Sequence, residues 1–263
     1  MQFITYWETP KNTKVPPWII LCLTIMRIKL GKQLRVLGPK CIKDLFGTEF
    51  TGQQRCFNKL EFQFNCGREN IVARSDAIRI AYIYHFGGTW LDADTLILKK
   101  PISAIYPHGV TERLHWSSEA IFGAKPNNKI LKEALNNMSK SATHDWGDPG
   151  QVKTLVENNP RAIEPISPSI FDPGYTPAYR FQTCDTLNSK SVSVDSFIKN
   201  EDLALLKLYN TYFTRTAGEL LPVMDFLQSN TLLANIFLSI EPNLDFWANE
   251  SKVTEEYLIT INS

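Results

Sequence analysis

Residues 74–94 read RSDAIRIAYIYHFGGTWLDAD, and this stretch decides the fold. Apolar residues recur at helical spacing between positions 78 and 85, and the pair Gly87-Gly88 then stands where a helix is expected to end. The run Thr89–Leu91 that follows has the composition of a buried strand. A helix that feeds such a strand through a glycine turn is one half of an α/β unit.

The chain before this stretch supplies the matching half. Phe3–Trp7 is a short aromatic and β-branched run that favours a first strand. Pro16 and Pro17 precede a helix predicted over 18–30, because proline fits the first turn of a helix, and 33–37 follows as a second strand. We therefore predict an α/β fold with a central, mostly parallel but mixed sheet flanked by helices.

Beyond residue 94 the pattern continues. Residues 95–98 extend the strand pairing, and a second unit follows with a strand at 120–124 and a helix at 129–138. The segment 160–185 is rich in proline and predicts a long functional loop. Because 263 residues suffice for one substantial core, we predict a single domain over 1–263.

Composition narrows the class of protein. The formal net charge of +1 gives no electrostatic reason to expect a nucleic-acid partner. Five cysteines without a C-x-x-C pair predict neither a disulfide framework nor a zinc site and favour a reducing compartment. The apolar run at 18–26 is short and polar residues interrupt 220–240, which predicts an amphipathic helix there. We expect no transmembrane segment and a cytoplasmic protein.

Two carboxylates stand where the predicted strand ends. On an extended segment Asp92 and Asp94 would point to one side while Ala93 faces away. Oxygen ligands so placed suit Mg²⁺ or Mn²⁺, which bind few protein carboxylates together with substrate phosphates. A bare D-x-D is common by chance, and a solvated turn is the alternative that the pair alone leaves open.

Asp76 and Arg79 are three residues apart on the predicted helix and share one face. A carboxylate there can accept hydrogen bonds from sugar hydroxyls, and a guanidinium can donate to hydroxyls or phosphates. An intrahelical ion pair that contributes little is the equally open alternative.

Taken together, this stretch resembles the sugar-binding region with the D-x-D motif in glycosyltransferase family 32 and in related capsular polysaccharide synthesis proteins. The matching positions are Ser75-Asp76, Arg79, Gly87-Gly88 and Asp92-x-Asp94. The resemblance implies a GT-A-like fold and transfer of a hexose from a UDP- or GDP-hexose donor with Mn²⁺ or Mg²⁺. It further implies retention of configuration at the transferred sugar and a role in polysaccharide, lipopolysaccharide or glycan biosynthesis.

The same resemblance implies roles for individual residues. The donor-binding part would span about 1–125 and the acceptor side about 126–263. The acceptor would be a saccharide, and a lipid-linked acceptor would place the protein at the inner membrane face. Asp92 would contact sugar or ribose and Asp94 the metal. The donor-binding residues would also include Arg74, Asp76, Arg79 and Gly88.

Two further residues, Trp7 and Lys207, each have two possible roles. Trp7 ends the first strand, where an aromatic ring could stack on the nucleotide base or belong to the core. Lys207 stands where related capsular enzymes often have a histidine, and a protonated ammonium cannot ligate a metal. Either Lys207 neutralises the leaving phosphate or the correspondence at this position is not the right one.

Two other functions compete with sugar transfer. A magnesium-dependent phosphate-processing enzyme could use the same carboxylates, although the chain has no G-x-x-x-x-G-K-[ST] loop. A non-catalytic module that binds a nucleotide sugar or carbohydrate could keep the same donor pocket. Incubation with nucleotide sugars separates these from a transferase.

Overall fold

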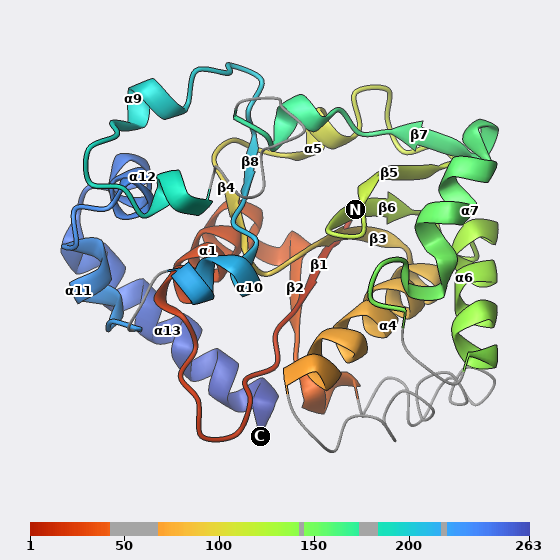
Figure 1. The fold of residues 1–263 in the computed structure, drawn as a ribbon, viewed down its shortest axis with the longest axis horizontal. Coiled ribbons are helices and arrows are strands. Elements are labelled where there is room, and N and C mark those ends of the chain that lie inside the picture. Colours follow the sequence, from red (N-terminus) through yellow and green to blue (C-terminus); the bar gives the residue numbers. More distant parts are fainter. Residues whose placement is uncertain (43–67, 142–144, 174–183, 217–219) are drawn as a thin grey trace.

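A six-stranded sheet forms the centre of the structure (Figure 1). The structure is a computed structural model and describes residues 1–42, 68–141, 145–173, 184–216 and 220–263. The strand order is β2-β1-β3-β6-β5-β7. In chain order these strands are β1 (Phe3–Tyr6), β2 (Leu34–Leu37), β3 (Gly88–Leu91), β5 (Leu114–Ser118), β6 (Ile121–Ala124) and β7 (Ile163–Pro165).

The sheet is mixed. Strand β1 is parallel to both β2 and β3, and β7 is parallel to β5, whereas β6 is antiparallel to its neighbours β3 and β5. Parallel pairs are therefore the majority, which confirms the predicted mixed sheet of an α/β fold. Because β1 and β3 run the same way, their carboxyl ends meet at one edge of the sheet.

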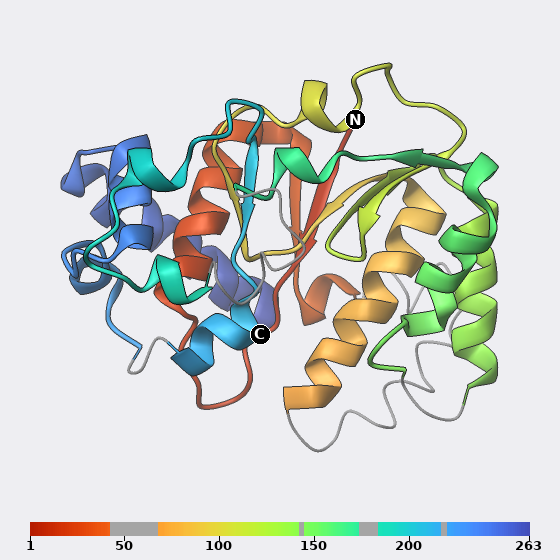
Figure 2. The same cartoon turned by 45° about the horizontal axis from the view of Figure 1, so that its top comes forward.

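Helices cover both faces of this sheet. Helices α1 (Pro17–Leu30) and α13 (Leu244–Asn262) lie on one side, and α4 (Arg68–Phe86), α6 (Lys129–Lys140) and α7 (Val152–Asn158) on the other, as the two views show (Figures 1 and 2). Successive strand residues enter different cores: Phe3 joins the core around α1, and Ile4 joins the core around α4. Both faces of the central strands are thus buried.

A separate two-stranded ribbon stands beside the sheet. It pairs β4 (Thr95–Ile97) with β8 (Leu205–Lys207) in antiparallel register. The predicted extension of strand pairing at 95–98 is confirmed, but its partner is β8 instead of the main sheet. This ribbon brings residue 207 next to residue 95, more than a hundred positions away along the chain.

Helices α5 (Ile102–Ile105), α9 (Val194–Phe197) and α10 (Asn210–Thr216) are short connections. The predicted helix at 220–240 is instead two helices, α11 (Val223–Leu227) and α12 (Leu232–Ile240). The break arises because Asn230 has a φ of 58° and Thr231 caps α12 by accepting the backbone N–H of Ala234. Among the described residues no helix is long and apolar enough to cross a membrane.

The proline-rich stretch at 160–185 is partly regular. It contains β7, an edge strand of the main sheet, and two turns of 3₁₀-helix, at Pro160–Ala162 and Pro168–Ile170. Residues 174–183 of this predicted loop lie outside the described residues, as do Cys56 and Cys66. Among the described residues, the cysteines at 22, 41 and 184 form no disulfide.

Candidate functional site

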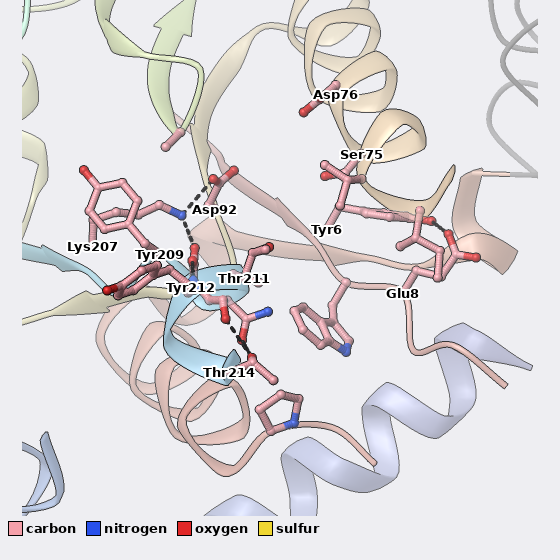
Figure 3. A pocket seen from close by; sticks show the side chains of 18 of the residues that line it. Tyr6, Glu8, Ser75, Asp76, Asp92, Lys207, Tyr209, Thr211, Tyr212 and Thr214 are labelled. Atoms are coloured by element: carbon pink, nitrogen blue, oxygen red, sulfur yellow. Dashed lines mark hydrogen bonds and ion pairs between the residues drawn. The ribbon is translucent and has the colours of Figure 1, made fainter. Parts of the chain in front are cut away.

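A cavity of about 700 Å³ opens at the edge of the sheet where β1 and β3 end. Its walls come from the end of β1, from α4, from the turn after β3, from the β5–β6 hairpin and from the β8–α10 connection. Figure 3 shows Lys207 and Tyr209 on one side of it, with Asp76 on α4 across from them. Segments from both halves of the chain therefore build a single cavity.

The turn that follows β3 carries the D-x-D carboxylates. The Thr95 N–H donates to the carbonyl oxygen of Asp92 at 3.0 Å, so these residues form a tight turn. The expectation of an extended segment is therefore wrong, because the chain must bend here to leave β3 and enter the separate ribbon. Asp92 and Asp94 nevertheless converge, since both carboxylates contact the ammonium of Lys207.

Lys207 lies between the two carboxylates. Its Nζ is 2.9 Å from Oδ2 of Asp92 and also contacts Oδ1 of Asp94 (Figure 3). The other oxygen of Asp94, Oδ2, accepts the backbone N–H of Asn210 at 2.6 Å. The backbone carbonyl of Asp94 accepts the N–H of Leu208 at 2.9 Å. Asp94 thus fixes both the lysine and the start of α10.

Asp92 has a different second partner. Its Oδ1 accepts the indole N–H of Trp90 at 2.8 Å and lies 3.7 Å from the guanidinium of Arg79. Burial alone would raise the pKa of Asp92, but Lys207 and Arg79 hold that pKa below its ordinary value. Burial alone would likewise lower the pKa of Lys207, and the two carboxylates raise it above its ordinary value instead. Asp92 and Lys207 are therefore both charged at neutral pH.

Helix α4 adds a second ion pair to the same cavity. Arg79 Nη2 lies 2.5 Å from Oδ1 of Asp76, and both residues are buried although they line the cavity. The intrahelical ion pair left open by the sequence is present, and it also faces the cavity. Through Arg79 it joins Asp92, so that Asp76, Arg79, Asp92, Lys207 and Asp94 form one chain of alternating charges.

Arg74 does not itself line the cavity. Its Nε is 3.4 Å from Oε2 of Glu8, which does line the cavity. The same carboxylate oxygen accepts the hydroxyl of Tyr6 at 2.6 Å. Trp7, the predicted base-stacking residue, stands between Tyr6 and Glu8 in the chain and also lines the cavity. It donates its indole N–H to Thr9 Oγ1 at 3.1 Å. Arg74 therefore positions Glu8 at the end of β1.

Gly88 lies outside the cavity, at the far end of β3. Its φ of 109° suits glycine, and a Cβ there would come within 2.5 Å of Ile4 Cδ1 and 2.7 Å of the Gln2 carbonyl oxygen. Close packing of β3 against β1 therefore accounts for the glycine. A donor contact by Gly88 stays a prediction from resemblance.

We expect Gly88→Ala to lower the free energy of unfolding by about 2 kcal/mol, because it combines backbone strain with overpacking. Urea denaturation measures this change. Gly109→Ala is the matched control, since Gly109 also has a positive φ (77°) but has open space around a Cβ. A Gly88→Ala protein of unchanged stability with weakened nucleotide binding would instead support the donor role.

Several lining residues were missed by sequence reasoning. They follow Lys207 and come from the β8–α10 connection: Tyr209, Asn210, Thr211, Tyr212, Thr214 and Arg215. The clustered aromatics at 209 and 212 were the available signal, but only the β4–β8 pairing places them beside the D-x-D. Lys14 and Arg215 are exposed cations of the lining, and neither has an ion pair among the described residues.

The fit of a divalent cation can be judged from the carboxylates themselves. Asp92 and Asp94 offer the oxygen ligands that Mg²⁺ and Mn²⁺ prefer. Each of the four carboxylate oxygens, however, already accepts a hydrogen bond, from Lys207, Trp90 or Asn210. The described residues include no group of three or more His, Cys, Asp or Glu that could hold a metal. The pair does not fit a divalent cation while Lys207 lies between its members.

A known protein family matches the part of the chain that carries the D-x-D carboxylates. Residues 49–112 match the family described as the glycosyltransferase sugar-binding region containing the DXD motif. This match includes α4, β3 and both D-x-D carboxylates. No curated protein matches the chain. The chain thus carries a glycosyltransferase-like sugar-binding region.

Two solved structures are similar at low identity. The one titled PaToxG Glycosyltransferase is 14% identical, with 60% of this chain and 68% of that chain covered and a TM-score of 0.41. The other is described as the structure of a transferase mutant with two cysteine-to-serine substitutions. It is 12% identical, with 70% of this chain and 89% of that chain covered and a TM-score of 0.32. Likeness at this level carries no argument about the reaction.

Proposed function

We propose that this protein is a glycosyltransferase that moves a hexose from a nucleoside diphosphate sugar to a saccharide acceptor. The observation that carries the proposal is the convergence of Asp76, Arg79, Asp92 and Trp7 on one cavity at the strand ends. Three of these residues lie within the part of the chain that matches a sugar-binding region. A cavity of about 700 Å³ also lies within the range of about 300–1,000 Å³ that is usual for small-molecule sites.

The cavity offers a group for each part of such a donor. The indole of Trp7 would stack on the base, and Asp76 with Arg79 would hold the sugar hydroxyls. A carboxylate oxygen can accept two hydrogen bonds, so Asp92, which is more exposed than Asp94, would also accept one from the sugar or ribose. Lys14 and Arg215 at the cavity lining would contact the diphosphate. Their positive charge complements the two negative charges of that group.

Transfer exchanges one bond at the anomeric carbon for another. The bond to the diphosphate oxygen breaks, and its electron pair stays on the departing nucleoside diphosphate. The acceptor hydroxyl oxygen bonds to the anomeric carbon, and its proton passes to the departing phosphate oxygen. Fixed positive charge that meets the growing negative charge stabilises the transition state more than the ground state. The resemblance favours retained configuration, which NMR of the product determines.

The sequence predicts Mn²⁺ or Mg²⁺ at the D-x-D carboxylates. D-x-D regions generally bind a divalent cation, and the two carboxylates have the right chemistry. The position between them is the one that Lys207 Nζ takes. In the transfer step, the positive charge that meets the leaving diphosphate would therefore come from side chains of the protein itself.

The acceptor side and the location rest on resemblance. We propose that 1–263 acts as one unit, with the donor part at about 1–125 and the acceptor part at about 126–263, although Lys207 and Tyr209 of the second part also line the donor cavity. The acceptor would be a saccharide of polysaccharide, lipopolysaccharide or glycan biosynthesis, lipid-linked at the inner membrane face or free in the cytoplasm.

Incubation with a panel of UDP- and GDP-hexoses tests the proposal. Release of nucleoside diphosphate, alone or with transfer to added saccharides, supports it. Tight binding of the donors without release would support the binding module. Release of inorganic phosphate or of nucleoside monophosphate would support the phosphate-processing enzyme.

Trp7→Ala is expected to weaken nucleoside diphosphate binding about 10-fold, because stacking of an aromatic ring on a base contributes about 1–3 kcal/mol. Calorimetric titration with UDP and GDP measures the effect. Trp146→Ala is the control, since Trp146 is 55% exposed and lies outside the cavity lining. Equal affinities of wild type and Trp7→Ala for the nucleoside diphosphates would mean that Trp7 is a core residue and does not stack on the base.

A further inference from the structure

We propose that Lys207 is the resident cation of the D-x-D pair, and that sugar transfer by this protein therefore requires no divalent metal. The proposal rests on the proposed function, because it names the group that takes the place of the metal in that same site. It departs from the Mn²⁺ or Mg²⁺ that the sequence predicted.

The ammonium lies at the point where the two carboxylates converge. Nζ is 2.9 Å from Asp92 Oδ2 and contacts Asp94 Oδ1, so one oxygen of each carboxylate faces the same positive charge. The remaining oxygens accept N–H groups of Trp90 and Asn210. A cation that bridges the two carboxylates is thus already present, and no carboxylate oxygen is left without a donor.

The backbone of Lys207 is fixed at this place. Residue 207 on β8 pairs directly with Thr95 on β4, one position after Asp94. The neighbouring Leu208 donates its N–H to the carbonyl of Asp94 at 2.9 Å. Only 8% of the lysine side chain is exposed, and Nζ lies 5.7 Å from the centroid of the Tyr209 ring. The fold therefore delivers the ammonium to the carboxylates and surrounds it.

Repulsion between positive charges disfavours a divalent cation in addition to Lys207. Asp76, Asp92 and Asp94 carry three negative charges, and Arg79 and Lys207 carry two positive ones. A divalent cation added beside the ammonium would face strong repulsion from it, and one that replaced the ammonium would leave a buried lysine without its carboxylates. Neither placement of a divalent cation is therefore favourable at this site. Lys14 and Arg215 provide further positive charge toward a bound diphosphate.

The first measurement uses the wild-type protein and does not depend on activity. Titration with Mn²⁺ alone, followed by electron paramagnetic resonance of the free ion, is expected to show no stoichiometric site at micromolar concentrations. Lys207→Ala should gain one Mn²⁺ site at least ~10-fold tighter than any wild-type site, because two adjacent carboxylates are then left without their cation. Lys132→Ala, which removes an exposed lysine on α6 outside the cavity lining, should behave as wild type.

The second measurement uses release of nucleoside diphosphate from a donor sugar. Wild-type release should be unchanged within about 2-fold by EDTA, whereas release by Lys207→Ala should fall at least ~100-fold and recover in part with Mn²⁺. A stoichiometric Mn²⁺ site in the wild type, or wild-type release that EDTA abolishes, would overturn the proposal. So would a folded Lys207→Ala protein that gains no Mn²⁺ site.

The two proposals fail in different ways. Absence of nucleotide binding and of donor turnover would count against the transferase, while the Mn²⁺ titrations would still report on the carboxylate pair. Should Lys207→Ala not fold, the wild-type titration and the EDTA experiment decide on their own.

Discussion

Asp94→Asn is expected to lower turnover about 1,000-fold, the largest loss predicted for a single substitution in this protein. Asn keeps the size of Asp94 but removes the charge that faces Lys207 and exchanges one acceptor oxygen for an N–H₂ group. One of two contacts must then be lost, either the one to the ammonium or the one to the Asn210 N–H. Removal of one partner from an electrostatic catalytic arrangement typically costs about 100- to 1,000-fold in turnover.

The same substitution should reduce stability. Breaking a buried ion pair by removing one partner costs about 3–5 kcal/mol, and we expect about 3 kcal/mol here because Asp92 still pairs with Lys207. Turnover is therefore compared at a temperature where circular dichroism shows the variant to be folded. Release of nucleoside diphosphate from the donor gives the rate.

A double variant supplies the control for Asp94→Asn. Lys207→Met together with Asp94→Asn removes one charge of each sign, so the pair of changes should be less destabilising than the sum of the single changes by more than about 1 kcal/mol. Additive losses would mean that Asp94 and Lys207 do not interact. Near-wild-type turnover by folded Asp94→Asn would mean that the charge of Asp94 is not needed for the reaction.

The elements that carry the site follow closely from local patterns. Apolar spacing and the glycine pair locate α4 and β3, and the proline pair locates the start of α1, because these signals act within a few residues. The convergence of Asp76 and Arg79 on the cavity follows from the helical repeat. Fold class was accessible for the same reason, since helix and strand alternate along the first part of the chain.

The position of Lys207 shows why the other contacts of the site could not be predicted from the sequence. Its place beside Asp94 depends on the pairing of β4 with β8, two strands of three residues that are separated by over a hundred positions. Strands this short have no detectable period, and β7, which also has three residues, went unassigned for the same reason. The turn at Asp92 likewise depends on the pairing of the following strand, β4, with β8. Side-chain contacts across such distances are decided by tertiary packing.

Asp76→Ala is expected to lower kcat/KM for the donor sugar about 100-fold while nucleoside diphosphate affinity stays within about 2-fold. Asp76 lies on α4, across the cavity from Lys207, where a sugar hydroxyl would donate to it (Figure 3). Its loss removes that acceptor and releases Arg79, whose remaining ion pair within the described part of the chain is the one with Asp92 at 3.7 Å. Loss of a charged, buried hydrogen-bond partner costs about 2–3 kcal/mol, which corresponds to about 30- to 150-fold in rate.

Two controls separate recognition of the sugar from structural damage by Asp76→Ala. Glu112→Ala breaks an exposed ion pair with Lys125, so it should leave turnover unchanged and stability within about 0.5 kcal/mol. Asp76→Asn keeps an acceptor for the hydroxyl and for Arg79, so it should recover part of the lost rate without a change in nucleotide affinity. If Asp76→Ala leaves turnover at the wild-type level, the pair with Arg79 only holds α4 together. If it weakens nucleoside diphosphate binding as much as turnover, Asp76 supports the whole pocket, and the sugar contact must be assigned to Asp92.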